Sequence, residues 1–426
     1  MLKAADNELL TRVGPATGMG QTLRRYWWPI CTSQDVAEPD CDPIRVKLLG
    51  ESFVAFRDTD GHVGVLDEHC PHRGASLVYG RNEKCGIRCL WHGWKMDVNG
   101  AVRDLPNVVD STRLLERLKS RALPVHEAGG LVWVYAGPAE ERPSAPDYHW
   151  MRVPETHRLI VPVDLDCNYV QPLEGLADSS HVGILHQDTL APVAEAASEA
   201  AALVGVSAPV LEVESTDFGM HYASLRLLTE GRRQVRITAY IAPSIFLIPS
   251  SGAAFLTVPL DDTHSRFYNI FFSEDEPLVG TEAGRAKIEF FGLTDEQIDG
   301  AGMRAKRSWP ETGDSWNRFS QDRAGMRTGR TFSGLGGLTA EDAAMTSSMG
   351  AIYDRSTEHL VPADQAVIRM RRILLESAAR VARGEAPIGL KTVTDVGEVR
   401  SWSSFLEPGQ DWHALVADHV VVDRSR

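Results

Sequence analysis

The sequence lacks the long apolar and basic runs that mark membrane-spanning or nucleic-acid-binding proteins. No apolar run approaches the roughly 20 residues of a membrane span, and the N-terminus, MLKAADNELL, has neither the basic nor the apolar part of a secretory signal. The 44 basic residues are outnumbered by 58 acidic ones, which gives a net charge of −14. These absences predict a cytoplasmic protein whose main partner is neither a nucleic acid nor a membrane.

Cysteine is scarce, and a glycine-rich dinucleotide-binding pattern is missing. The six cysteines among 426 residues are too scattered for a disulfide framework. No Gly-x-Gly-x-x-Gly follows an expected strand, so the sequence predicts no nicotinamide-binding domain. Hydrophobic residues make up 43% of the chain and charged residues 24%, which is typical of a globular protein. A chain of this length has room for two domains.

The chain divides into two parts of different character. Residues 1–150 contain stretches such as 44–67 and 129–137 that predict an all-β domain, preceded by a helical segment. The segment 137–150 is rich in proline and charge and predicts the domain boundary. Residues 151–426 mix strand and helix patterns. We therefore expect an α+β protein whose second domain has a central antiparallel sheet flanked by helices.

Two later segments differ in how clearly they can be assigned. Residues 364–385 have an amphipathic pattern that predicts a helix with one face toward a core. Residues 279–350 are polar and rich in glycine. Apart from a helical piece at 282–291, their pattern predicts no definite element.

Two cysteines stand close to histidines in one short run. Cys70 is followed by His72, and Cys89 by His92, so each loop offers one thiolate and one imidazole. A [2Fe–2S] centre of the Rieske type needs that division, with two thiolates on one iron and two imidazoles on the other. Structural zinc usually takes its ligands as Cys–Cys and His–His pairs, and it remains the alternative.

A second candidate metal site follows about 80 residues later. On one helix Glu174, Asp178 and His181 would lie at i, i+4 and i+7 and form a polar stripe. His186 comes five residues after His181, about 140° round an ideal helix. Both imidazoles can bind one ion only if the helix ends or distorts between them, and Gly183 would tolerate such a distortion. Two histidines and a carboxylate are the ligands of non-haem Fe(II) oxygenases.

The two motifs together resemble the α subunit of Rieske non-haem iron oxygenases. The pattern C-x-H…C-x-x-H is followed by N-x(5)-E-x(3)-D-x-x-H-x(4)-H, in the order of that family. The phthalate dioxygenase branch resembles this chain in LVYGRNEKCGIRCLWHGWK, LEGLADSSHVGILH and VPADQAVIRMRRILLESA. The resemblance extends over nearly the whole chain.

The resemblance implies a [2Fe–2S] cluster and a mononuclear Fe(II) as cofactors. His181 and His186 would bind the mononuclear iron together with a carboxylate late in the chain. Asp364, at the start of the helix expected at 364–385, matches the position of that carboxylate best. The alternative for Asp364 is an acid that stabilises a helix N-terminus through the helix dipole.

The resemblance also implies residues that support electron transfer. Asp178 would accept a hydrogen bond from an iron-bound histidine and would link it to His72 or His92 of a neighbouring subunit. Such a link implies a homo-oligomer, a trimer or stacked trimers. Asn168 and Glu174 match positions behind the iron ligands, and the alternative for each is a helix cap or a surface polar residue.

The family implies the oxygenase component of a system with a separate NAD(P)H-dependent reductase. Its substrates would be O₂ and an aromatic acid. Two reactions remain open: hydroxylation or dihydroxylation of a phthalate-like ring, and oxidative O-demethylation of a methoxylated aromatic acid. A third hypothesis, a Rieske electron carrier without oxygenase activity, predicts that an iron ligand is missing from the second site.

Arginines on expected strands of the second domain are candidates for binding a substrate carboxylate. Arg226 and Arg236 alternate with apolar residues, and guanidinium groups pair with carboxylates in a bidentate manner. His221 is a further candidate. The alternative is that these side chains point to solvent.

Overall fold

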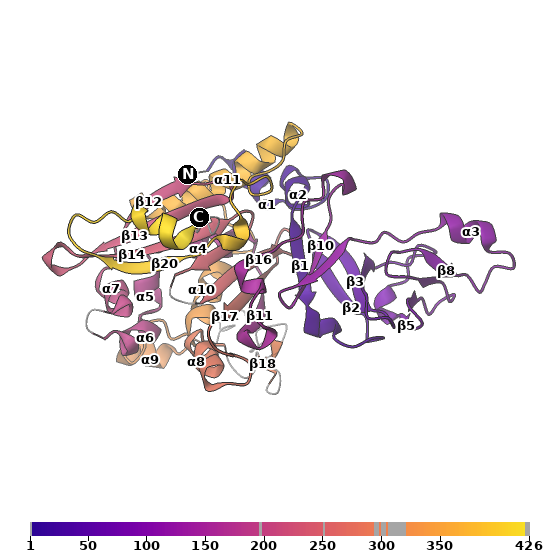
Figure 1. Cartoon of the computed structure of the whole chain (residues 1–426), viewed down its shortest axis with the longest axis horizontal. Helices are drawn as coiled ribbons and strands as arrows, with labels where there is room; N and C mark the ends of the chain where they lie inside the picture. Colours follow the sequence, from indigo (N-terminus) through magenta and orange to yellow (C-terminus); the bar gives the residue numbers. More distant parts are fainter. Residues whose placement is uncertain are drawn as a thin grey trace. The chain divides into compact units, whose positions relative to one another are not determined.

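The chain forms two compact units (Figure 1). The computed structural model describes residues 2–195, 198–249, 252–293 and 321–421, together with the backbone of 298–299 and 304–305. We call the two units the small unit and the large unit. The small unit comprises Val13–Ala16 and Gly20–Pro146, and the large unit comprises Met1–Arg12, Thr17–Met19 and Asp147–Arg426.

The small unit is built from antiparallel sheets, as its alternating sequence predicts. In β2, Val46 and Leu48 are buried while Arg45 and Lys47 are exposed. Its sheets, in the described part of the chain, are β1 (Trp27–Thr32), β10 (Leu131–Tyr135) and β9 (Val125–Ala128); β2 (Ile44–Leu48), β3 (Glu51–Arg57) and β4 (Val63–Asp67); and β5 (Arg81–Asn82), β6 (Ile87–Arg88), β7 (Lys95–Met96) and β8 (Val102–Asp104). The helix α3 (Thr112–Arg117) belongs to this unit, and α2 (Gly18–Leu23) begins in the large unit and ends in the small one.

The large unit is organised around one antiparallel sheet, which confirms the expected α+β fold. The sheet order is β11-β17-β16-β15-β14-β13-β12. The last strand, β20, lies antiparallel beside the first part of β14 and pairs with it from Arg233↔Leu406 to Ile237↔Trp402. Apolar side chains from β11, β16 and β17 form a core with α8 and α10. The strands are β11 (Arg158–Leu165), β12 (Val210–Ser215), β13 (Gly219–Leu227), β14 (Arg233–Ile241), β15 (Ile245–Ile248), β16 (Ala253–Pro259), β17 (Ser265–Phe272) and β20 (Trp402–Leu406). A separate pair is formed by β18 (Ile298–Asp299) and β19 (Arg304–Ala305).

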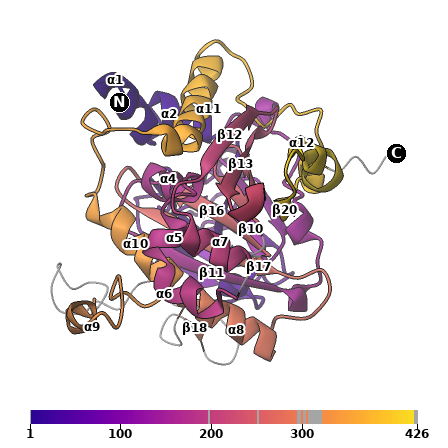
Figure 2. The ribbon, with the colours of Figure 1, turned by 90° about the vertical axis from the view of Figure 1, so that its left-hand side faces the viewer.

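Helices cover this sheet and carry the residues of the second candidate metal site. In Figure 2, α4, α5 and α7 lie in front of the strands, and α4 contacts both β16 and α10. The expected helical piece at 282–291 is α8. The helices are α4 (Val170–Ala177), α5 (Val182–Leu185), α6 (Gln187–Leu190), α7 (Glu199–Gly205), α8 (Glu282–Phe290), α9 (Arg323–Thr328), α10 (Leu338–Ser348), α11 (Gln365–Ala382) and α12 (His413–Leu415).

The amphipathic segment 364–385 forms α11, the helix that its pattern predicts. Val367, Ile373 and Leu374 are buried, and the helix packs on β12, β13 and α4. No helix in the described ranges of the chain is both long and apolar enough to span a membrane.

The N-terminal helix α1 (Ala4–Thr11) corrects the expected division of the chain. We expected a first domain of residues 1–150 that includes the N-terminal helical segment. The structure instead places α1 in the large unit, because it packs against α11 and its Leu10 is fully buried there. The Asn7 side chain also donates a hydrogen bond to the Tyr353 carbonyl oxygen at 3.1 Å.

Candidate metal centres and cavity

The two cysteine–histidine loops, 70–75 and 89–94, are built alike. Each begins where a cysteine N–H donates to a carbonyl five residues on, and each turns at a glycine with positive φ, +75° at Gly74 and +76° at Gly93. Residues with a β-carbon rarely adopt that φ, which explains the glycines. The hydrogen bonds are Cys70 N–H to Ala75 O (2.8 Å) and Gly74 N–H to Cys70 O (2.9 Å), matched by Cys89 N–H to Trp94 O (2.8 Å) and Gly93 N–H to Cys89 O (3.0 Å).

The four predicted cluster residues converge at the tips of these loops. Cys70 and Cys89 are buried, and burial raises the pKa of the Cys70 thiol to about 11. The His72 and His92 rings lie 4.5 Å apart between centroids, and the Trp94 ring stacks on His72. His72 Nδ1 is buried without a hydrogen-bond partner in the described structure. A buried thiol pair and an unpaired imidazole nitrogen suit a metal cluster, which deprotonates thiols and accepts the nitrogen lone pair.

The second site brings together two histidines and a carboxylate, as the sequence predicts, but the carboxylate is Asp342. Asp342 Oδ1 lies 3.5 Å from His181 Nε2 and 3.2 Å from His186 Nε2. One ligand atom from each residue lies within 4.8 Å of the others. Two imidazole nitrogens and one carboxylate oxygen at these distances can surround a single divalent ion.

The helix expected over 170–186 is interrupted, and the interruption lets both imidazoles face one point. α4 ends at Ala177, and Asp178 takes an extended conformation with φ −90° and ψ 116°. The chain then turns back into α5, which ends before His186. The interruption therefore precedes His181, and a second helix end, at His186, provides the break that the spacing of the two histidines requires.

Gly183 serves the packing of helices. A β-carbon on Gly183 would lie 2.0 Å from the Leu203 carbonyl oxygen of α7. The residue is a glycine because the backbones of α5 and α7 approach closely. The distortion that we expected at Gly183 is instead found at the two ends of α5.

Each histidine has its own carboxylate partner at Nδ1. His181 Nδ1 lies 3.3 Å from Asp178, and His186 Nδ1 lies 2.7 Å from Glu341. Burial alone would lower the pKa of His186, but Asp342 and Glu341 raise it to about 9. Burial acts to raise the pKa of Asp178 and Asp342, and the neighbouring histidines reverse that effect and lower both. The site is therefore rich in negative charge, which favours a cation.

A mostly apolar cavity of about 330 Å³ borders the second site. His181, His186 and Asp342 lie in its wall, and Arg236 brings a guanidinium group to it. Its apolar walls include Leu165, Leu176, Val182, Leu190, Leu203, Ile248, Phe255, Phe267, Phe290, Phe291 and Leu338, and its other polar lining residues include Asp178, Ser179, Glu199, Tyr222, Thr238 and Asn269.

Comparison with known families decides the identity of the chain. The Rieske [2Fe-2S] domain family matches residues 26–120, and the family described as "LigXa C-terminal domain like" matches residues 134–426. The chain is also 37% identical to the phthalate 4,5-dioxygenase oxygenase subunit of Pseudomonas putida over 431 residues, which cover 99% of this chain and 96% of the relative. The chain belongs to the Rieske non-haem iron oxygenases. As an oxygenase of this family it carries a Rieske [2Fe–2S] cluster and a mononuclear iron.

Two further relatives of this Rieske oxygenase differ in the reactions that their names state. It is 34% identical to the 3-chlorobenzoate-3,4-dioxygenase oxygenase subunit of Comamonas testosteroni over 99% of each chain. It is 29% identical to the 5,5'-dehydrodivanillate O-demethylase oxygenase subunit of Sphingobium sp. (strain NBRC 103272 / SYK-6), over 91% of this chain and 83% of the relative. All three relatives are named as oxygenase subunits.

Asp364 is not part of the group formed by His181, His186 and Asp342, which corrects the third predicted ligand. It lies at the start of α11, where its carboxylate accepts a hydrogen bond from the Val361 N–H at 2.6 Å. Asp364 therefore lies at a helix start, as the alternative expected, and its side chain closes the short 3-10 turn Pro362–Asp364 in front of α11 without a capping hydrogen bond to α11 itself. The carboxylate that faces the two histidines comes from α10, within the segment whose pattern predicted no definite element.

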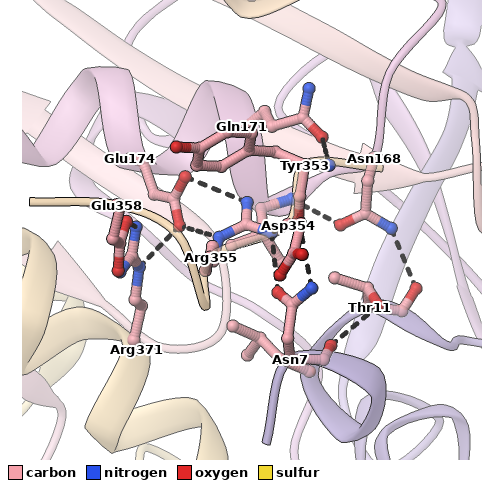
Figure 3. A network of polar contacts seen from close by, with 12 residues as sticks. Asn7, Thr11, Asn168, Gln171, Glu174, Tyr353, Asp354, Arg355, Glu358 and Arg371 are labelled. Atoms are coloured by element: carbon pink, nitrogen blue, oxygen red, sulfur yellow. Dashed lines mark hydrogen bonds and ion pairs between the residues drawn. The ribbon is translucent and has the colours of Figure 1, made fainter. Parts of the chain in front are cut away.

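Asn168 and Glu174 lie in a buried polar network (Figure 3), and among the described side chains their hydrogen bonds go to residues other than His181 and His186. Asn168 donates hydrogen bonds to the carbonyl oxygens of Thr11 (2.8 Å) and Asp262 (2.7 Å). The Glu174 carboxylate accepts from the guanidinium groups of Arg355 (2.9 Å) and Arg371 (2.6 Å). The network joins α4 to α1 and α11. It fixes the placement of α4, which directly precedes Asp178.

Two of the three predicted substrate residues do not line the cavity. Arg226 is fully buried, and it donates to the Ser179 carbonyl oxygen at 2.7 Å, behind the chain segment that carries Asp178. Burial lowers the pKa of Arg226 to about 10. His221 lies 2.7 Å from a carboxylate oxygen of Glu214. Arg236 does line the cavity, and it stays a candidate.

Sequence reasoning missed Asp342 and Glu341, which are adjacent on α10. The signal was present as two consecutive acids in the stretch LTAEDAAMTSS. Consecutive acids are also common on exposed helices, so the pattern did not distinguish a metal site from a solvated surface. Only the packing of α10 against α4 reveals the difference.

Proposed function

We propose that this oxygenase subunit inserts oxygen into an aromatic carboxylate of the phthalate type. The proposal rests on the apolar cavity beside His181, His186 and Asp342, in which Arg236 is the only guanidinium among the described lining residues. Apolar walls suit an aromatic ring, and a guanidinium group suits its carboxylate. The names of two relatives, phthalate and 3-chlorobenzoate dioxygenase oxygenase subunits, support this substrate class.

The ligand assignments follow from the two clusters of side chains. When bound, the Rieske cluster supplies single electrons and the mononuclear iron supplies the site at which O₂ is activated. The protein positions both and keeps the aromatic ring in an apolar environment. We assign the cluster to Cys70, His72, Cys89 and His92, and the mononuclear iron to His181, His186 and Asp342. Because the second site offers a full set of ligands, the hypothesis of an electron carrier is disfavoured.

The carboxylate-binding group is already paired within the protein. Arg236, on β14, forms an ion pair with Glu199 at the start of α7, and both line the cavity. A substrate carboxylate would take the place of Glu199 on the guanidinium group. This exchange would favour ligands whose carboxylate reaches Arg236 while their aromatic ring packs against the apolar walls of the cavity.

Electrons would enter the iron site through Asp178. Its carboxylate contacts His181 and is about one quarter exposed, at 24%. We propose that it links His181 through hydrogen bonds to His72 or His92 of a neighbouring subunit in a trimer, so that electrons pass from the cluster to the iron along this link, and that a separate reductase supplies the cluster. Exposed apolar side chains beside the cluster, Leu90 and Trp91, support docking at that tip. In an Asp178→Asn variant the reductase should reduce the cluster at the normal rate, but electron transfer from the cluster to the iron should be slow. Rapid-mixing absorption spectroscopy measures both rates.

Single-turnover chemistry tests the proposed reaction. Reduced, iron-loaded protein would be mixed with O₂ and a panel of phthalates, hydroxybenzoates and methoxybenzoates, with products identified by mass. A hydroxylated or dihydroxylated phthalate supports the proposal. Formaldehyde from a methoxybenzoate would support O-demethylation instead, a reaction named for one relative. No product from any of them, with an intact cluster spectrum, would contradict both.

The role of Arg236 is tested by direct binding of the carboxylates. An Arg236→Gln variant should bind the preferred acid about 10–100-fold more weakly, since hydrogen bonds to a charged group are worth roughly 1.5–3 kcal/mol. Arg233→Gln is the matched control. It removes a guanidinium group three residues earlier on β14, where the side chain faces the other side of the sheet. Equal affinities of the Arg236 variant and the parent would contradict the assignment.

A further inference from the structure

A closed chain of contacts surrounds His186 on the side away from the proposed iron. Glu341 accepts from His186 Nδ1 at 2.7 Å, and the Ser333 hydroxyl donates to the other Glu341 oxygen at 2.5 Å. Asp188, two residues after His186, accepts from the Phe332 N–H at 2.8 Å and the Ser333 N–H at 3.3 Å. The loop that holds Ser333 is thereby tied to the chain that holds His186.

The burial of Glu341 makes these contacts strong. Its side chain is 1% exposed, and a buried carboxylate is stable only when its oxygens accept hydrogen bonds. Each of its two oxygens has one such bond, one from His186 and one from Ser333. Since the acceptor is fixed, the proton of a neutral His186 imidazole is fixed on Nδ1. The lone pair of Nε2 then points toward Asp342.

The two histidines of the site differ in this respect. The partner of His181 is Asp178, at 3.3 Å and with about one quarter of its side chain exposed, whereas the partner of His186 is fully enclosed. Each carboxylate is also held by a serine, Asp178 by Ser180 and Glu341 by Ser333. The Asp178 carboxylate is open to water and the Glu341 carboxylate is not, so we expect the contact of His186 to hold its ring more firmly.

We propose that Glu341, held in place by Ser333 and Asp188, is a positioning residue that sets the tautomer and orientation of His186 and thereby the affinity for iron. The inference rests on the proposed iron site. Outer carboxylate partners of metal-binding histidines raise the basicity of the ligand and fix its ring, and their loss lowers metal affinity about 10–100-fold.

The test measures metal binding by the full chain, without turnover. Fe(II) is titrated anaerobically against a chromophoric chelator, and Co(II)-loaded protein provides a visible spectrum that reports the ligand geometry. Glu341→Gln keeps the shape of the side chain and removes its charge. We expect its Fe(II) dissociation constant to rise about 10–100-fold and the Co(II) bands to shift, while circular dichroism shows that the metal-free variant is folded.

Two further variants keep the inference testable if Glu341→Gln fails to fold. Ser333→Ala and Asp188→Asn each remove one contact to the chain around His186, so each should weaken Fe(II) binding by a smaller factor. An unchanged dissociation constant and Co(II) spectrum in the folded variants would overturn the inference. A His186→Ala variant that still binds Fe(II) normally would instead overturn the iron site itself.

Discussion

At the scale of residues, two consecutive acids serve opposite ends of one imidazole. Successive side chains on a helix point about 100° apart, so Glu341 and Asp342 reach different atoms of a ring that lies across α10. Glu341 meets His186 Nδ1 and Asp342 faces Nε2. The two neighbouring acids therefore have different functions: Glu341 holds the His186 ring, and Asp342 faces the proposed iron. Exchanging the two residues would preserve neither function.

The choice of Asp342 over Asp364 as the iron ligand is open to a direct test. Loss of an outer carboxylate partner lowers metal affinity about 10–100-fold. Asp342→Asn removes a ligand itself, so we expect its iron affinity to fall by more than that. Asp364→Asn should keep its iron, since that carboxylate only accepts the Val361 N–H. Iron content after desalting, measured by atomic absorption, distinguishes the two. Iron loss from the Asp364 variant alone would restore the prediction made from the sequence.

At the scale of elements, periodicity predicted the helices that pack but missed the places where they end. The apolar stripe of α11 was enough to place it, because a long amphipathic pattern has one physical explanation. The segment 170–186 has helical spacing throughout, yet the helix ends at Ala177. Buried Arg226 and the close approach of α7 fix the path beyond that point, and neither can be seen in local spacing.

Replacement of Gly183 tests the close approach of α5 and α7. The added methyl group of Gly183→Ala would collide with the Leu203 carbonyl oxygen, so the variant should be destabilised by about 1–3 kcal/mol and should lose iron. Gly205→Ala is the matched control, because a β-carbon there meets nothing within 4 Å. Thermal unfolding and iron content report both effects. An iron-replete, stable Gly183→Ala protein would show that α5 can shift without harm.

The buried network of Figure 3 should contribute to stability more than any exposed ion pair does. Glu174→Gln leaves the buried guanidinium group of Arg355 without its carboxylate partner, while Arg371 keeps its ion pair with Glu358. Breaking a buried pair in this way costs about 3–5 kcal/mol. Glu385→Gln, which breaks an exposed pair with Arg383, should have no measurable effect on unfolding in urea. Similar unfolding midpoints for the two variants would contradict the assigned role of the network.

At the scale of the whole molecule, the sequence located both metal motifs and the class of each domain, while connections over long distances escaped it. The Cys-x-His and Cys-x-x-His loops are local, so their ligands could be predicted one by one. Asp342 and the place of α1 depend on which elements pack together, which a single sequence does not show. The same is true of Arg226, whose partner Ser179 lies in the bend between α4 and α5.

Removal of residues 1–12 tests the assignment of α1 to the large unit. Leu10 is fully buried, and burial of a leucine side chain contributes roughly 1.5–3 kcal/mol. The truncated protein should therefore unfold at a lower temperature by near-ultraviolet circular dichroism, and its cluster absorption should be unchanged. Loss of the cluster spectrum would instead place the helix with the small unit, as first expected.

The ligands of the proposed iron are far apart in the sequence, and most strands of the central sheet lie between them along the chain. His186 precedes most strands of that sheet, and Asp342 follows all but β20. An ion bound by both joins the two ends of this long segment in the folded state. Because it binds the folded chain and not the unfolded one, it stabilises the fold by mass action, increasingly as the free iron concentration rises above the dissociation constant. Scarcity of iron would thus shorten the lifetime of the protein itself, as well as stop its catalysis.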